Sequence, residues 1–134
     1  MTTAAPSRLG SDTTTRGFRI NVEPQYETAH SDPDDHRFVF SYRVRVTNES
    51  SASATLVARH WVIVDADAER HDIDGDGVVG RQPRLEPGAF HEYASFCPLR
   101  TNWGTMEGSY SMVGDDGDEF EIEVGRFYLA AHDD

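Results

Sequence analysis

Apolar residues recur at every second position along most of this chain, which is the pattern of strands with one buried face. The alternation begins at Phe18 and Val22, and it is clearest from Arg37 to Thr47. The segment from Thr55 to Asp65 is apolar on both faces, as expected for a central strand. Further strands are predicted over residues 69–73, 89–97, 105–113 and 119–129. No segment shows helical periodicity with capping residues.

The spacing of these segments predicts the fold class. About seven short strands are typical of an antiparallel β-sandwich of the immunoglobulin or fibronectin type III kind. We expect an all-β domain over residues 18–131. Residues 1–17, which are rich in Thr, Ser and Ala, are predicted to be a disordered tail, and residues 132–134 a short acidic tail. The apolar phase slips at Gly125, which predicts a β-bulge.

A glycine-rich stretch, DIDGDGVVGRQPRLEPG from Asp72 to Gly88, is predicted to be a long structured loop. Gly75, Gly77 and Gly80 have the GxGxxG spacing of dinucleotide-binding loops. The two prolines that follow exclude the helix that this motif requires. Two readings remain: backbone amides of the loop bind a phosphate, pyrophosphate or nucleotide, or the glycines supply the positive φ of a tight turn.

The same stretch opens like a calcium-binding loop. Asp72, Asp74 and Asp76 occupy positions 1, 3 and 5, and Gly77 occupies position 6. Position 12, which should be a bidentate Glu, is Pro83. We therefore expect at most weak binding of Mg²⁺, Ca²⁺ or Co²⁺. The alternative is that these aspartates only fill an exposed loop of an acidic protein.

The charge balance narrows the possible partners. The 134 residues carry a formal net charge of -12, and all 12 basic residues are arginine. A nucleic-acid-binding protein needs a clustered basic face, so this class of function is not expected. Concentrated salt screens such self-repulsion, which suggests a salt-accumulating host. A genome rich in arginine codons is the alternative.

No constellation of side chains indicates catalysis or a cofactor. Cys97, the only cysteine, falls inside a predicted strand, and the six histidines are scattered without the spacing of a zinc site. A single cysteine excludes an internal disulfide and favours a reducing cytoplasm. The N-terminus lacks the apolar region of a secretory signal, and the longest apolar run, Trp61 to Val64, is too short to span a membrane.

Several stretches together resemble the ApaG family of small bacterial proteins: FVFSYRVRVTN, ARHWVIVD, GDGVVGRQPRLEPG, FHEYASFCPLRTNWGTMEGSYSM and GRFYLA. The resemblance extends from about Phe18 to Ala131. One departure is the full DxDxDG run, where the family form looks like GEGVVG. The matching positions are Arg59, Trp61, Gly75, Gly77, Gly80, Gln82, Pro83, Tyr93, Ser95, Gly104, Met106, Gly108 and Tyr110.

The resemblance implies a fibronectin type III-like sandwich and leaves the activity open. Bacterial members are linked to cobalt tolerance and magnesium efflux, and without a membrane span they would be soluble accessories to a transporter. Related domains in eukaryotic F-box proteins and in a polymerase-interacting protein suggest recognition of a protein partner. The family's glycine loop has also been proposed to bind pyrophosphate, here through Gly75, Gly77, Gly80, Gln82 and Arg59. We therefore expect a cytoplasmic, non-enzymatic protein-interaction module without a cofactor.

Overall fold

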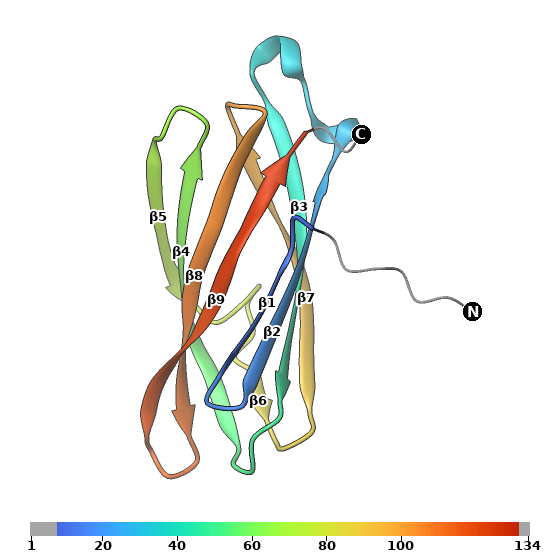
Figure 1. Cartoon of the computed structure of the whole chain (residues 1–134). Coiled ribbons are helices and arrows are strands. Elements are labelled where there is room, and N and C mark those ends of the chain that lie inside the picture. Colours follow the sequence, from blue (N-terminus) through green and yellow to red (C-terminus); the bar gives the residue numbers. More distant parts are fainter. Residues whose placement is uncertain (1–7, 132–134) are drawn as a thin grey trace, which may run out of the picture.

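The computed structural model describes residues 8–131, which form two antiparallel sheets packed face to face (Figure 1). One sheet has the strand order β1-β2-β3-β7. The other has the order β5-β4-β8-β9, and the short β6 also pairs with β4. The strands are β1 (Ser11–Thr15), β2 (Phe18–Tyr26), β3 (Phe38–Asn48), β4 (Ala54–Asp65), β5 (Arg70–Asp76), β6 (Arg84–Leu85), β7 (Phe90–Leu99), β8 (Trp103–Gly114) and β9 (Glu119–Ala130).

This architecture confirms the predicted all-β sandwich. The pairing of β2, β3 and β7 against β5, β4, β8 and β9 is the fibronectin type III arrangement, to which β1 and β6 are additions. The only helices in residues 8–131 are two 3-10 turns, Thr28–His30 and Pro33–Asp35, in the loop between β2 and β3.

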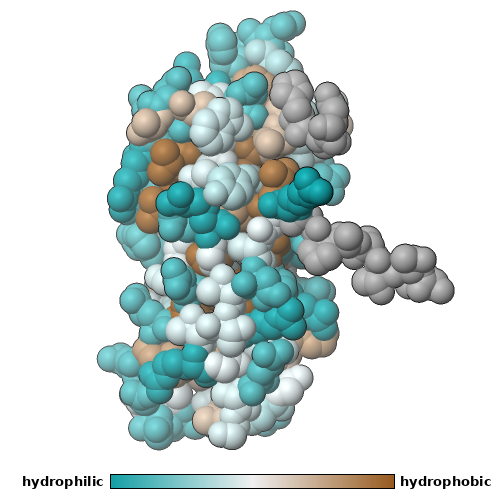
Figure 2. Space-filling view, in the orientation of Figure 1, coloured by the Kyte–Doolittle hydropathy of each residue, from teal (hydrophilic) through white to brown (hydrophobic). Residues whose placement is uncertain are grey.

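The core follows from the alternation in the sequence. In β3, Phe40, Val44 and Val46 are fully buried, whereas Arg43 and Arg45 face solvent. Burial of each such apolar side chain contributes about 1.5–3 kcal/mol. In Figure 2 most of the visible surface is hydrophilic, and hydrophobic residues show mainly in its upper half. A mostly hydrophilic surface is expected when alternate residues of each strand point between the sheets.

Trp61 lies at the centre of the core. Its ring packs edge-on against Tyr42, Tyr110 and Phe127, with ring centroids 5.6, 6.0 and 5.9 Å away. Such pairs add about 0.5–1.5 kcal/mol to the contribution of burial. Aromatic residues of β3, β4, β8 and β9 therefore hold the middle of the sandwich together.

Two β-bulges modify the second sheet. At the first, Gly125 and Arg126 of β9 lie opposite Glu107 of β8, which confirms the bulge predicted at Gly125. The second places the extra residue Val57 in β4, between the pairs formed by Leu56 and Ala58. The sequence gives no sign of this second bulge, although it anchors the glycine-rich segment described below.

The prediction of a disordered tail over residues 1–17 is wrong for residues 8–17. Ser11–Thr15 form β1, which pairs with β2 through a two-residue turn at Arg16 and Gly17. The strand has no apolar residue, so periodicity did not reveal it. Residues 1–7 and the predicted acidic tail at 132–134 lie outside the described residues.

The prediction of one loop from Asp72 to Gly88 is also wrong in its first part. Arg70–Asp76 form β5, which pairs with residues 58–64 of β4. The irregular segment therefore begins at Gly77 and is interrupted by β6. The strand predicted over residues 69–73 therefore extends to Asp76, and charged residues at alternate positions and a glycine conceal this extension.

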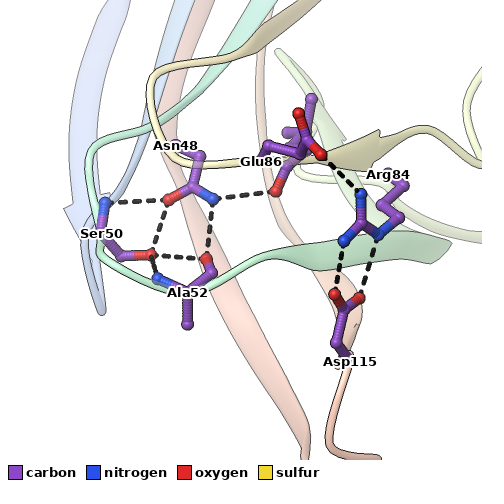
Figure 3. Close-up of polar contacts among 7 residues, drawn as sticks. Asn48, Ser50, Ala52, Arg84, Glu86 and Asp115 are labelled. Carbon is purple, nitrogen blue, oxygen red and sulfur yellow. Dashed lines mark hydrogen bonds and ion pairs between the residues drawn. The ribbon is translucent and has the colours of Figure 1, made fainter.

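A buried asparagine ties the turns at one end of the sandwich (Figure 3). The Asn48 side chain is fully buried and donates to the carbonyl oxygens of Ala52 and Leu85, at 2.9 Å each. Its own oxygen accepts from the backbone amide and the hydroxyl of Ser50. Arg84 next to Leu85 pairs with Asp115 and Glu86. Every polar atom of this amide thus has a partner, which offsets its desolvation.

Within residues 8–131, no helix has the length and apolar character that a membrane crossing requires.

Candidate functional site

A groove of about 610 Å³ lies between the edges of the two sheets. One wall is β7 and the other is β5; within residues 8–131, β7 pairs only with β3 and β5 pairs only with β4. Trp61, Ile63 and Met106 contribute to the apolar interior of the groove, and Ile73 and Phe96 line it from the two edge strands. The side chain of Ile73 is 43% exposed, so the apolar lining continues to the surface at β5, whereas alternation turns Phe96 to the outward face of β7 at the rim of the groove.

Cross-sheet contacts define the two ends of the groove. Tyr93 of β7 contacts Tyr110, which is the cross-strand partner of Arg59. Leu99 lies against Gly104, which pairs with Asp65. One end is therefore at the level of Arg59 and the other at the level of Asp65, about 20 Å away along β4.

Arg59 braces the turn that follows β5. Its Nη1 donates to the carbonyl oxygens of Asp76 and Gly77, at 2.9 and 3.0 Å. The guanidinium lies against Gly75, where a Cβ would be only 2.6 Å from Cζ of Arg59. Gly75 is therefore required for close approach, and its φ is not positive. The side chain is thus held in one position at the end of the groove.

Hydroxyl groups gather beside Arg59. The hydroxyls of Tyr93 and Tyr110 are 2.5 Å apart and form a polar link between the two sheets. Burial raises the pKa of both tyrosines. Burial also raises the pKa of Tyr42, although its hydrogen bond to Ser95 opposes this shift. These tyrosines remain protonated at neutral pH and can act as neutral hydrogen-bonding groups.

The glycine-rich turn is pinned to the bulge in β4. The Val57 carbonyl accepts from the Gly77 amide at 2.8 Å and from Gln82 Nε2 at 2.9 Å. Gly77 has a φ of 57°, and a Cβ there would collide with the Arg81 carbonyl oxygen. Gly80 has a φ of 75° with open space around it. The expectation of positive φ is thus confirmed at Gly77 and Gly80, but it is wrong at Gly75.

Most amides of this turn already have partners. Gly77 donates to Val57, and Val78 and Arg81 donate to each other's carbonyl oxygens. No helix follows Gly80, as the prolines predicted. An anion would have to replace these hydrogen bonds to be held by the same amides. The geometry therefore gives the phosphate reading of the loop little support.

The three aspartates of the predicted metal site lie on the outward face of β5. Asp72 pairs with Arg70, which lowers the pKa of that carboxyl. Asp74 Oδ1 lies 2.6 Å from His60 Nδ1, and alternation places Asp76 on the same outward face. Among residues 8–131, no three His, Cys, Asp or Glu side chains are arranged to hold a metal ion. Extended backbone separates these carboxylates, whereas a calcium loop would fold them around the ion.

Cys97 is buried in β7 and lines the groove. Burial raises the pKa of its thiol to about 12. A nucleophilic cysteine needs a depressed pKa, so this thiol lacks the character of a catalytic group at neutral pH.

Comparison with known proteins identifies the sequence family. The ApaG domain model matches residues 28–114. Protein ApaG of Anaeromyxobacter dehalogenans is 50% identical over 119 residues, which cover 89% of this chain and 94% of the relative. The chain belongs to the ApaG family. Protein ApaG of Brucella suis biovar 1 is 47% identical over 86% of this chain and 88% of its own length.

Solved structures agree with this assignment. A crystal structure of a Bordetella pertussis protein named ApaA matches with a TM-score of 0.83 and 44% identity, covering 84% of this chain and 92% of the other. The C-terminal domain of wzt matches with a TM-score of 0.56 and only 11% identity, which shows a similar fold alone.

The structure brings together ApaG motif residues that are distant in the sequence. Arg59, Tyr93, Ser95, Tyr110 and Gly75 meet at one end of the groove. Tyr42 joins them, although sequence reasoning placed it only in the core. Its signal was its position on the buried face of β3, opposite Ser95 of β7. By contrast, Gly80 and the three aspartates do not line the groove around Trp61, apart from Asp72 at its rim.

Proposed function

We propose that this ApaG domain is a non-enzymatic binding module that holds an extended segment of a partner protein in the groove between β5 and β7. The supporting observation is the groove itself, an apolar cavity of about 610 Å³ bordered by two sheet edges that no strand of residues 8–131 pairs with. Concave, largely apolar sites with a few polar groups are the usual form of binding pockets.

The two edge strands favour an extended ligand. An unpaired edge presents backbone N–H and C=O groups to which another strand can add. Edge strands that avoid such pairing carry charges, and β5 has Arg70, Asp72, Asp74 and Asp76. In contrast, β7 has only Glu92 besides His91, and it exposes Phe90 and Phe96. The free edge of β7 is therefore the better template for an added strand.

A role in divalent-cation homeostasis is part of this proposal and would be exerted through the bound partner. The chain's own aspartates are engaged by Arg70 and His60 or stand apart on β5. The proposal also places the domain in the cytoplasm, where the free thiol of Cys97 would stay reduced.

Selection of displayed peptides on the immobilised domain tests this function. We expect peptides that bind the wild-type domain and shift the NMR amide signals of β7 and β5. Ile73→Glu introduces a charge into the groove and should weaken these peptides about tenfold or more, as loss of a binding hot spot does. Tyr128→Glu is the control, because Tyr128 is equally exposed at 43% but lies on β9.

Two results would contradict the proposal. The first is a selection that yields no peptide able to distinguish the wild type from Ile73→Glu. The second is a set of amide shifts confined to strands that do not border the groove, such as β1, β2 and β9.

A further inference from the structure

We infer that the segment held in this groove carries an acidic side chain, Asp or Glu, whose carboxylate pairs with Arg59. The inference rests on the proposed function and adds the chemistry that the groove selects. It comes from the arginine's geometry, from the charges around it and from the register of the two strands.

Among residues 8–131, no carboxylate pairs with Arg59, although the chain has 24 acidic residues and only 12 basic ones. Five other arginines form ion pairs within residues 8–131: Arg16, Arg19, Arg70, Arg84 and Arg126. Arg59 instead donates only through Nη1, and only to carbonyl oxygens. Within the same residues, no hydrogen bond or ion pair engages its Nε or Nη2.

The position of this arginine explains why the chain's own carboxylates do not reach it. Register with Gly75 and Tyr110 puts Arg59 on the inward face of β4, the same face as Trp61. Asp74 and Asp76 alternate to the opposite, outward face of β5. On the inward side the charge of Arg59 acts on the tyrosine cluster, where it opposes the rise in pKa that burial causes at Tyr42 and Tyr93. This end of the groove is therefore positively charged on an otherwise acidic protein.

The guanidinium is also preorganised. Its packing against Gly75 and its two bonds to backbone carbonyls fix the planar group before any ligand arrives. A ligand carboxylate would therefore not have to order a free arginine side chain. Charge-assisted hydrogen bonds to a carboxylate are about twice as strong as bonds between neutral groups.

The charges of the groove also place the acidic residue of the segment. The opposite end contains Asp65, Glu69 and Arg100, so two carboxylates stand there against one guanidinium. Asp65 Oδ1 already accepts from the amides of Asp67 and Glu69, so it stays in place. Between the ends lie Trp61 and Ile63, one and two same-face steps from Arg59. The favoured ligand therefore has an acidic residue at the Arg59 end of the groove and, on the same face of its strand, apolar residues beside Trp61 and Ile63.

A double-mutant cycle tests this pairing. The probes are an extended peptide with one Glu among alternating Val and Phe, the same peptide with Glu replaced by Gln, and the same peptide with phosphoserine at that position. We expect the Glu peptide to bind the wild-type domain about tenfold more tightly than the Gln peptide. With Arg59→Gln the two peptides should bind equally. With Arg59→Lys the preference for Glu should be partly retained.

The cycle separates the possible failures. If R59Q disturbs the turn, both peptides weaken together, but the difference between them still reports the pairing. Arg100→Gln is the matched control, since Arg100 lines the groove at its other end and should leave the preference for Glu unchanged. A Glu preference that persists in R59Q would overturn the inference and leave the proposed function standing. Tighter binding of the phosphoserine peptide than of the Glu peptide would likewise replace the carboxylate with a phosphate. If none of the peptides binds in the groove, the proposed function itself fails.

Discussion

The two lateral edges of the sandwich differ in whether contacts close the gap between the two sheets. At the closed edge, where β1 and β2 meet β9, the Tyr128 amide donates to the Leu9 carbonyl and the Glu123 amide to the Thr15 hydroxyl. Arg16 spans the seam, pairing with Asp118 and lying 4.2 Å above the Phe120 ring. At the open edge, β5 and β7 leave the groove between them.

We interpret the closed edge as a contributor to stability and the open edge as a binding surface. The closed edge shows that the chain can seal a gap between sheets, even with a short strand made only of Ser, Asp and Thr. If burial were the only requirement, a similar strand would cover the open edge as well. Apolar surface left exposed in a groove is a common mark of a binding site. Substitutions of buried residues beside the closed edge should therefore lower stability strongly, whereas substitutions at the open edge should affect stability little and binding more.

The largest difference is expected between two apolar truncations. Phe127→Ala removes a fully buried ring that packs on Tyr42 and Trp61, and it should lower the free energy of unfolding by about 3–5 kcal/mol. Ile73→Ala at the open edge should cost less than about 1 kcal/mol, because the side chain is 43% exposed. Urea denaturation of both variants measures this contrast. Equal losses would mean that the open edge is as important for stability as the core.

The second prediction concerns the thiol at the open edge. The pKa of Cys97 rises from 9.0 to about 12 on folding, so the native state holds this proton more tightly than the unfolded state. Its contribution to stability is complete below pH 9 and is lost as the pH rises toward 12. The free energy of unfolding of the wild type, relative to that of Cys97→Ala, should therefore fall by about 1.4 kcal/mol when the pH is raised to roughly 10. Parallel pH profiles for the two proteins would show that water reaches the thiol inside the groove.

The smallest effect is expected at the turns that end each edge. Arg16-Gly17 and Val79-Gly80 are two-residue turns with positive φ at both positions, where Asn-Gly is preferred. Val79 is β-branched, has a φ of 49° and is 60% exposed, so its conformation is strained. Val79→Asn should therefore raise the free energy of unfolding by about 1 kcal/mol.

Arg16→Asn is the comparison for this turn. It relieves less strain because arginine is unbranched, and it removes the ion pair with Asp118. We expect no gain in stability, as judged by thermal melting. A loss of stability in Val79→Asn would show that the valine makes contacts that outweigh its strained backbone.

The sequence was sufficient for the parts of the fold that rest on apolar alternation. Phe40, Val44 and Val46 revealed β3, and the phase slip at Gly125 revealed the bulge. It failed at β1, which is stabilised by backbone pairing and hydroxyl contacts and has no apolar face, and it found only the first half of β5. In β1 the inward Thr13 packs beside Gly125, which is a contact that no local pattern encodes.

The candidate site was predictable only in pieces. The motifs named Arg59, Tyr93, Ser95 and Tyr110, but they could not show that these residues meet at the end of one groove. That meeting depends on the register of β7 with β3 and of β4 with β8. The spacing of the three aspartates led to a wrong expectation, because residues that are regularly spaced in the sequence do not converge in space here. Residues at every second position suggested ligands of a loop, whereas in an extended strand they share a face without converging.

The seam at the closed edge also decides where this domain can be cut for transplantation into another protein. The family match stops at Gly114, before β9, and starts at residue 28, after β2. A graft trimmed to that span would lack Phe18 and Ile20 on one side and Phe127 and Leu129 on the other. Its remaining sheets would expose bare apolar surfaces and invite precipitation. A fusion partner should therefore be joined outside residues 8–131.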